Sequence, residues 1–403
     1  MTFEPPPVVS EAPALTQMPI SGADRNGRMS LGVLAKRTYL VGPDGRCHLA
    51  PEQLPLNYGV VEDPDNPECI LAEPDLFLDK LETDVVVRGH AWNHAGAPAF
   101  YAGVQVHRYP AKQVAVFGER KLIKTATGRI AFSEPTVLDK VPLSYAYAYG
   151  GVDERAEREW GSTVEAMGDQ LDPETRDLVL SAASPWRYPR NRGGKGYLVD
   201  DHPESLDALE LPNLEDPHDL LSGDRIIVRD PWYWPLLPIP ASFDWLDGGN
   251  FPRMGYFGQT PEWAEDDLTQ YVDAFPEVRY GYADRKIFFY PPNLLDIPKH
   301  FDRRALNGAS MGLRFPYLGG GETITTANLH PQLPNWSVRL PGERPTLWVD
   351  DRAGGLNELR PQLYTVVLEP DEGRLTLLWV GFGPAKRQYF EHELLAMPML
   401  VEW

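Results

Sequence analysis

Cysteine is nearly absent from this sequence. Cys47 and Cys69 are its only two cysteines in 403 residues, too few for a disulfide scaffold, and free thiols are typical of a reducing compartment. No apolar run reaches the ~20 residues that a membrane-spanning helix needs. The N-terminus has no basic stretch followed by an apolar run, so we expect no signal peptide. These features predict a cytoplasmic protein outside the membrane.

Positive charge is also scarce. The chain has 38 Lys and Arg against 58 Asp and Glu, which gives a formal net charge of −20. Nucleic acids and anionic membrane surfaces are bound chiefly through lysine and arginine, so neither is an expected partner. An acidic surface attracts partners that carry basic patches.

Proline and glycine are abundant, with 40 and 35 residues. The proline share is about twice the average for proteins. Because both residues interrupt regular structure, the chain is expected to consist of many short elements joined by turns, and a helical bundle is not expected. We predict a mainly β protein with antiparallel sandwich or barrel-like sheets and short helical insertions, between the all-β and α+β classes.

Strand-forming residues recur between turn signals along most of the chain. The clearest hairpin joins Gln362–Leu368 to Arg374–Gly381 across the turn EPDEG. A second hairpin is expected to turn at Pro43–Gly45. The remaining predicted strands are Gly32–Val41, Cys47–Leu49, Thr83–Trp92, Gly103–Tyr109, Gln113–Phe117 paired with Arg120–Lys124, Arg225–Arg229, and segments within 319–329, 336–340 and 346–349.

Three regions follow from this pattern. Residues 1–30 form a patternless, proline-rich arm. Residues 31–150 form an antiparallel β domain, in which 50–80 is loop by composition. Residues 151–403 form a second β-rich region with helical insertions at 153–183 and 260–272, where Asp172 and Thr260 are followed by proline as N-caps usually are.

The segment VPLSYAYAYGG, residues 141–151, has a tyrosine at every second position. Tyr145, Tyr147 and Tyr149 would share one face of a strand, with small alanines on the other. Such a row packs a second sheet or lines a recognition surface. Gly150 and Gly151 would end the strand.

One sequence motif suggests a hydrolase. Gly308 to Gly312 fits G-x-S-x-G with Ser310 as nucleophile, and Asp350 or Asp351 and His392 follow in the order that α/β-hydrolases use. The charged residues before the serine do not resemble a core strand, and a proline and glycines follow instead of a helix. We therefore favour a non-catalytic role, with the hydrolase as an alternative.

Two further motifs are weaker. His90 and His94 are four residues apart, but they lie where a strand runs into a turn, not on a helix. Lys195 in NRGGKGY lacks the spacing of a phosphate-binding loop. We therefore expect no metal and no cofactor.

Aromatic residues crowd among prolines at Trp232, Tyr233 and Trp234, with Trp245 following. Such clusters stack on sugar rings in carbohydrate-binding modules, which is a further alternative. Tyrosine and tryptophan are also enriched at protein contacts, which is the interpretation that we prefer.

Several segments in a fixed order resemble a bacterial family of unknown-function domains. They are PLSYAYAYGG at 142–151, NRGGKGY at 191–197, LPNLEDP at 211–217, FPRMGYFG at 251–258, GGGETITTANLHP at 319–331 and LEPDEGRLTLLW at 368–379. That family is encoded beside type VI secretion genes, next to the VgrG spike, PAAR tip proteins and toxic effectors. The resemblance covers nearly the whole chain from Gly32 to Trp379.

The resemblance implies a non-enzymatic adaptor or chaperone that binds an effector and assists its loading onto the VgrG/PAAR spike. It carries over no catalytic residues. From the residues themselves, we expect exposed aromatic and glycine-rich loops to contact the partner, helped by the proline-rich arm. The candidate partner-binding residues are Tyr145, Tyr147, Tyr149, Gly150, Gly151, Asn191, Gly194, Gly196, Tyr197, Asn213, Glu215, Trp232 and Trp234.

Overall fold

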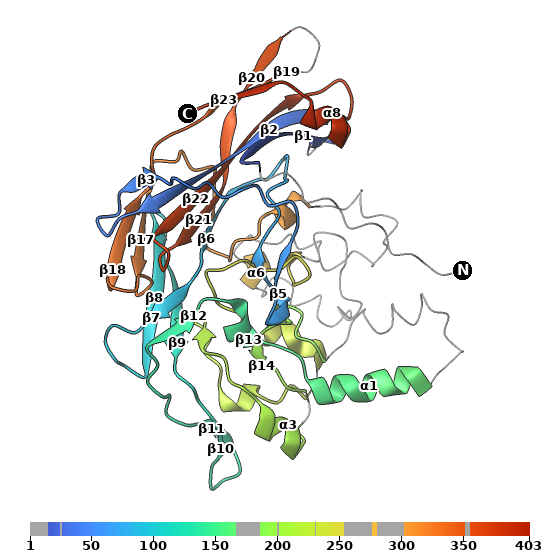
Figure 1. The fold of residues 1–403 in the computed structure, drawn as a ribbon. Coiled ribbons are helices and arrows are strands. Elements are labelled where there is room, and N and C mark those ends of the chain that lie inside the picture. The colour runs from blue at the N-terminus through green and yellow to red at the C-terminus, as the bar shows by residue number, and fades with distance from the viewer. Residues whose placement is uncertain are drawn as a thin grey trace.

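The computed structural model confirms a mainly β protein with several antiparallel sheets and few, short helices (Figure 1). It describes residues 15–24, 26–166, 186–199, 201–229, 231–253, 276–279, 302–350 and 355–403. Within these ranges no helix has the length and apolarity to cross a membrane.

The largest sheet has seven strands in the order β1-β2-β22-β21-β6-β16, with β3 also on β2. Its centre is the predicted C-terminal hairpin, in which β21 pairs antiparallel with β22 and Glu369 lies opposite Arg374. β21 pairs in parallel with β6 on its other side. The strands are β1 (Gln17–Ala23), β2 (Met29–Val41), β3 (Cys47–Leu49), β6 (Thr83–Val87), β16 (Arg314–Phe315), β21 (Pro361–Glu369) and β22 (Arg374–Pro384).

A second sheet has five strands in the order β15-β9-β8-β17-β18, all antiparallel. One buried apolar cluster contains Val85 and Leu377 from the first sheet together with Val104 and Ile324 from the second. The two sheets therefore share a core. The strands are β8 (Ala99–Val106), β9 (Lys112–Phe117), β15 (Leu214–Glu215), β17 (Thr323–Ala327) and β18 (Asn335–Arg339).

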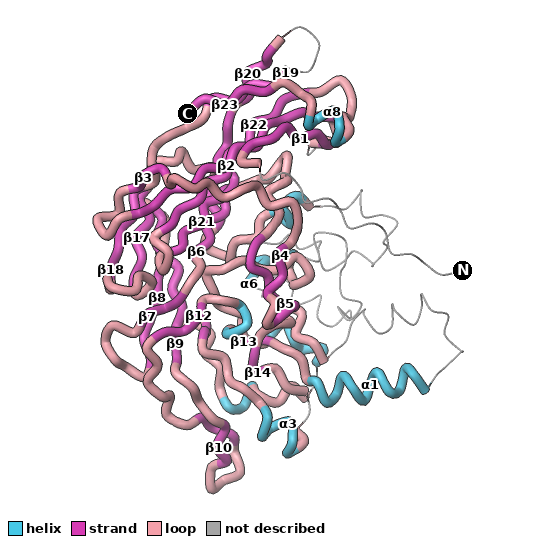
Figure 2. The backbone as a smooth tube through the Cα atoms, in the orientation of Figure 1, coloured by secondary structure: helices cyan, strands magenta, loops and turns pink. Residues whose placement is uncertain are grey.

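Smaller sheets surround this core (Figure 2). A three-stranded sheet, β20-β19-β23, lies at the opposite end of the molecule from the β10/β11 hairpin in Figure 1. These elements are β4 (Val61–Asp63), β5 (Asn66–Ala72), β7 (His90–Trp92), β10 (Leu122–Lys124), β11 (Ile130–Phe132), β12 (Lys140–Pro142), β13 (Tyr149–Gly150), β14 (Lys195–Gly196), β19 (Thr346–Asp350), β20 (Leu356–Leu359) and β23 (Met399–Glu402).

The helices are short, and along the sequence they alternate with the strands. α1 begins directly after Asp153, whose side chain accepts a hydrogen bond from the Ala156 amide and so caps the helix. The described helices are α1 (Glu154–Ala166), α3 (Pro203–Ala208), α6 (Pro276–Arg279) and α8 (Glu391–Leu395), with the 3-10 turns η1 (Tyr145–Tyr147), η3 (Gly223–Arg225), η4 (Pro231–Leu236) and η8 (Arg303–Leu306).

Several predicted boundaries were wrong. β1 lies inside the predicted arm, and β4 with β5 form a hairpin inside the predicted loop 50–80. The predicted strand Thr83–Trp92 breaks at Gly89, whose φ is +119°. Both large sheets combine strands from before and after residue 150, so the predicted division there does not separate two sheets.

Two further predicted strands do not form as expected, and two predicted helices cannot be compared with the structure. Arg120–Lys124 does not pair with the preceding strand; β10 instead pairs with β11. The predicted strand Arg225–Arg229 begins in the 3-10 turn η3, and only an isolated bridge links Ile227 to Leu198. The predicted helices that start at Asp172 and Thr260 lie outside the described residues.

Candidate functional site

The tyrosine segment does not form the expected strand. Tyr145 to Tyr147 is a 3-10 turn, in which the Ser144 hydroxyl accepts a hydrogen bond from the Ala146 amide. The chain then extends only at Tyr149 and Gly150, which pair in parallel with Lys195 and Gly196. A local side-chain cap thus overrides the strand propensity of the tyrosines.

The three tyrosines consequently do not line one face. Tyr145 is buried in the core shared by the two large sheets, and Tyr147 packs half-buried against that core. Tyr149 is buried in a separate cluster. The segment is therefore a link between two cores, and the predicted row of rings on one surface is wrong.

Asn191 holds this link in place. Its buried side-chain amide donates to the carbonyls of Tyr145, at 2.8 Å, and Tyr149, at 3.1 Å. Its own carbonyl accepts from the Gly151 amide at 2.8 Å. A Cβ at Gly150 would lie 2.1 Å from that carbonyl oxygen, and one at Gly194 2.4 Å from the Asn191 side chain. The glycines are needed because the two backbones touch.

Asn213 and Glu215, from a third segment of the chain, also make hydrogen bonds that hold this link in place. The Asn213 amide donates to the Tyr147 carbonyl at 2.8 Å, and its side chain donates to the Phe117 carbonyl. Glu215 is buried and accepts from Arg120 and from the Leu221 amide. Burial raises the pKa of Glu215, while Arg120 opposes the rise. Both residues are internal, so neither forms a partner surface.

Tyr197 and Trp234 belong to a buried aromatic cluster with Tyr149 and Tyr188. Tyr188 lies 5.1 Å from Tyr149, 5.3 Å from Tyr197 and 6.4 Å from Trp234 between ring centroids. Trp232 lies in the turn η4, and its side chain is outside the described atoms. The aromatic anchors expected on the surface at 149, 197 and 234 are therefore internal.

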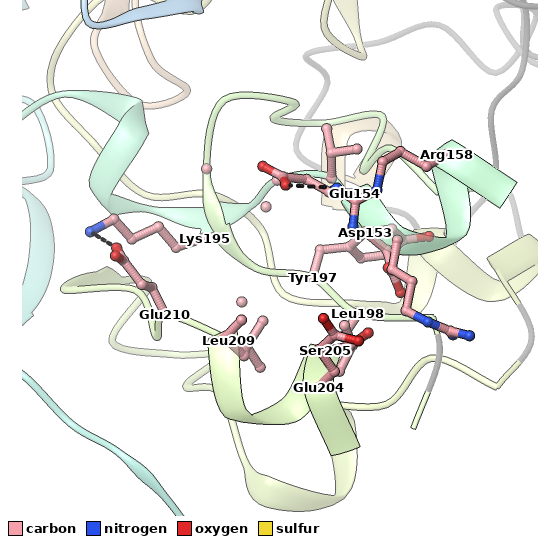
Figure 3. A pocket seen from close by; sticks show the side chains of 17 residues that line it. Asp153, Glu154, Arg158, Lys195, Tyr197, Leu198, Glu204, Ser205, Leu209 and Glu210 are labelled. Atoms are coloured by element: carbon pink, nitrogen blue, oxygen red, sulfur yellow. Dashed lines mark hydrogen bonds and ion pairs between the residues drawn. The ribbon is translucent and has the colours of Figure 1, made fainter. Parts of the chain in front are cut away.

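The glycines of the candidate set line a hollow (Figure 3), although Gly150, Gly151 and Gly196 are themselves buried and Gly194 is only partly exposed. The hollow measures about 440 Å³, and α1 and α3 stand on either side of it. A second hollow of about 870 Å³ includes Tyr147 and the β10 strand. Lys195 and residues 208–210 line both hollows, so the two lie next to each other.

An ion pair separates the two hollows. Lys195 Nζ lies 2.7 Å from Glu210 Oε2, and the ammonium also lies 4.7 Å from the centre of the Tyr147 ring. The Lys195 side chain and the Glu210 carboxylate face each other in Figure 3. Because Glu210 is largely exposed, the pair contributes little to stability and can exchange for other charged partners.

The first hollow is rimmed by charged groups from both helices. Glu154 lies 3.4 Å from Arg158 across one turn of α1, and α3 contributes the exposed Glu204. The sequence interpretation missed α3, although His202 and Pro203 followed by an acid is a recognisable helix start. Sequence reasoning had considered Lys195 only as a phosphate ligand and had overlooked Glu210.

The G-x-S-x-G motif lacks the context of a nucleophile elbow. The 3-10 turn η8 precedes Ser310, and a turn with the two-residue β16 follows it, where a hydrolase has a strand and a helix. Ser310 is buried and hydrogen-bonded to Tyr145. His392 is exposed on α8, with its ring stacked on Phe390.

The two histidines have separate partners. His90 Nδ1 lies 2.5 Å from Asp371 Oδ2, and His94 Nε2 lies 3.0 Å from the His330 carbonyl. In the described part of the chain, no group of three or more His, Cys, Asp or Glu side chains is arranged to hold a metal ion.

Taken together, the fold and the site define a mainly antiparallel β protein with a charged surface hollow beside a glycine-rich link. The model of a bacterial family, described as "Uncharacterized protein conserved in bacteria (DUF2169)", matches residues 26–380. The chain belongs to this family. No curated protein and no solved structure matches it.

Proposed function

We propose that this protein is a non-catalytic adaptor or chaperone of type VI secretion, which binds a toxic effector and assists its loading onto the VgrG/PAAR spike. The secretion context rests on the family resemblance of the ordered segments. The paired hollows on either side of Lys195 and Glu210 support a binding role.

These hollows carry the proposal because three distant segments build them at one place. Gly150, Gly151, Gly194 and Gly196 lie where a side chain would clash with neighbouring atoms, and α3 supplies the opposite wall. The buried residues Asn191 and Asn213 position these segments by hydrogen bonds. A surface formed in this way is preorganised, which lowers the entropic cost of binding.

The rim of the first hollow carries both signs of charge, because Arg155, Arg158 and Lys195 line it beside the acids. The case for a basic partner segment rests on the exposed acids and on the acidic chain as a whole. Glu154, Glu204 and Glu210 are exposed around the first hollow, and Asp207 lines the second. A partner lysine or arginine would displace Lys195 from Glu210 or bind Glu204. The chain's net charge of −20 would accelerate the encounter.

Charge reversal at the rim tests the proposal. The protein is mixed with each effector and VgrG encoded beside its gene, and binding is measured by pull-down and by calorimetry. We expect one effector to bind, and Glu204→Lys with Glu210→Lys to weaken its binding at least about tenfold, since two charge-assisted contacts are reversed.

Glu402→Lys is the matched control. It reverses an exposed charge on β23, in the three-stranded sheet at the far end of the molecule from α3 (Figure 1). Binding by this variant should equal that of the wild type. Monomeric behaviour of the wild type beside every neighbouring effector and spike protein would refute the adaptor role.

A further inference from the structure

A third hollow, of about 630 Å³, lies on another part of the molecule and contains two cations. Lys112, at the start of β9, and Arg314, in β16, both line it. Residues 216–219 and 239–240 complete the wall. None of these residues belongs to the candidate partner-binding set.

Arg314 is buried without a carboxylate partner. Three arginines of the described chain are almost fully buried: Arg190 and Arg253, at 2% and 3% exposure, and Arg314, at 7%. Arg190 and Arg253 each pair through two nitrogens with a buried glutamate. Arg314 donates only from Nε, to the Ala309 carbonyl at 2.9 Å, and its Nη2 has no hydrogen-bond partner.

The carboxylates behind Arg314 do not satisfy it. Asp84 attracts the guanidinium electrostatically, but its oxygens are bonded to Lys80, the Asn307 side chain and the Gly308 amide. Glu82 is also near, and burial raises its pKa. A buried guanidinium with an unused donor is costly, and a ligand that accepts a hydrogen bond from it would offset this cost.

Lys112 stands beside this arginine. Its Nζ donates to the Met311 carbonyl at 2.7 Å, a neutral acceptor, in the turn that Gly312 makes possible with a φ of +85°. The pKa of Lys112 is lowered to about 8, chiefly by burial; Asp216 opposes the shift, and the positive charge of Arg314 contributes to it. Met311 and Gly312, which belong to the G-x-S-x-G motif around Ser310, thus form part of the wall of this hollow and hold Lys112 in place.

The walls between the charges are apolar. The rings of Tyr109 and Phe315 lie 4.7 Å apart between centroids, and Pro240 and Pro316 line the same space. Asp219 also lines the hollow but is paired with Arg225 at 2.6 Å. Asp216 in the wall of the hollow, and Asp84 and Glu82 outside its lining, offset part of the charge on the two cations, which suits a monoanion better than a phosphate dianion.

We propose that this hollow binds a carboxylate carried on an apolar group, with Arg314 and Lys112 as its charged partners and the tyrosine and phenylalanine rings against its apolar part. The guanidinium has the donor geometry that a carboxylate oxygen accepts. Two sources supply this chemistry: a free carboxylic acid, or the C-terminal carboxylate of a polypeptide.

The site is tested by calorimetric titration of the full chain with N-acetyl-leucine and with its uncharged analogue, N-acetyl-leucinamide. We expect saturable binding of the acid and at least about tenfold weaker binding of the amide, because only the acid supplies the charge. Arg314→Gln should weaken binding of the acid by a similar factor, and Lys112→Gln by less. Lys140→Gln, at an exposed lysine outside the hollow, should leave it unchanged.

A short peptide ending in leucine, as acid and as amide, distinguishes the two sources. Tighter binding of the peptide acid than of N-acetyl-leucine assigns the site to a chain end, and equal binding assigns it to small acids. Equal binding of acid and amide by the wild type would overturn the proposal without any variant, as would the absence of saturable binding by both acids. Unchanged binding by a folded Arg314→Gln variant would overturn it too.

Discussion

The two large sheets and the region from 145 to 253 are held together by different forces. The sheets share a core of aliphatic side chains such as Val85, Val104 and Leu377. The second region has few strands and is fixed by buried polar side chains, among them Asn191 and Arg190, around an aromatic cluster. Apolar packing tolerates many substitutions of similar size, whereas a polar network fails when one partner is lost.

Removing Arg190 should have the largest effect. Its two ionic hydrogen bonds to Glu277 and its contact with the Trp234 ring are buried. Arg190→Met leaves the Glu277 carboxylate buried and unpaired, which should lower the free energy of unfolding by about 3–5 kcal/mol in urea denaturation. The double variant with Glu277→Leu should recover part of this loss, and a double variant no more stable than the single one would contradict the argument.

Leu377→Ala tests the contribution of apolar packing in the core of the two large sheets. Leu377 is fully buried in β22, so its truncation leaves a cavity between the sheets, and we expect a loss of about 3 kcal/mol. Amide hydrogen exchange sharpens the contrast. Arg190→Met should accelerate exchange mainly within 145–253, whereas Leu377→Ala should accelerate it in the strands. Identical exchange patterns would show that the two regions unfold as one.

Asp244 should make the free energy of unfolding depend on pH. Burial raises its pKa to about 6, while Arg88, at 3.0 Å, opposes the rise. The folded protein therefore keeps the proton up to about pH 6, whereas the unfolded chain releases it near pH 4, so this group lowers stability as the pH rises from 4 to 6. The loss should be about 2 kcal/mol relative to Asp244→Asn, measured by urea denaturation across this range. If the free energies of unfolding of the wild type and of Asp244→Asn change in parallel with pH, the predicted role of Asp244 is wrong.

Ser144→Ala should have the smallest effect. It removes the oxygen that accepts from the Ala146 amide at 3.2 Å and holds the 3-10 turn. We expect a loss of about 1 kcal/mol in thermal or urea denaturation. Ser337→Ala, on the exposed face of β18, is a matched control and should stay within about 0.5 kcal/mol of the wild type.

The sequence predicted the regular part of the fold better than the irregular part, for physical reasons. The hairpin of β21 and β22 follows from alternating β-branched and aliphatic residues around a turn, a signal confined to neighbouring residues. The parallel pairing of β21 with β6 joins residues 281 positions apart, such as Thr365 and Asp84, and no local pattern encodes it.

The candidate site shows the same limit. The glycines at 150–151 and 194–196 were identified by residue type, and they do lie together. The tyrosines were predicted to share one face of a strand, because strand propensity takes no account of the Ser144 cap or of the aromatic cluster that receives Tyr149. The unpaired guanidinium of Arg314 could not be found at all, because the lack of a partner depends on the packing of distant segments.

The pairing of β2 with β22 has a consequence for biosynthesis. Eleven residue pairs, from Ser30 to Leu40 on one strand, match a partner about 340 residues later. A nascent chain therefore emerges from the ribosome with one edge of the long strand β2 unpaired until β22 has been synthesised. Exposed strand edges of this kind promote aggregation, so the newly made polypeptide should depend on holding factors until β22 is available to pair with β2.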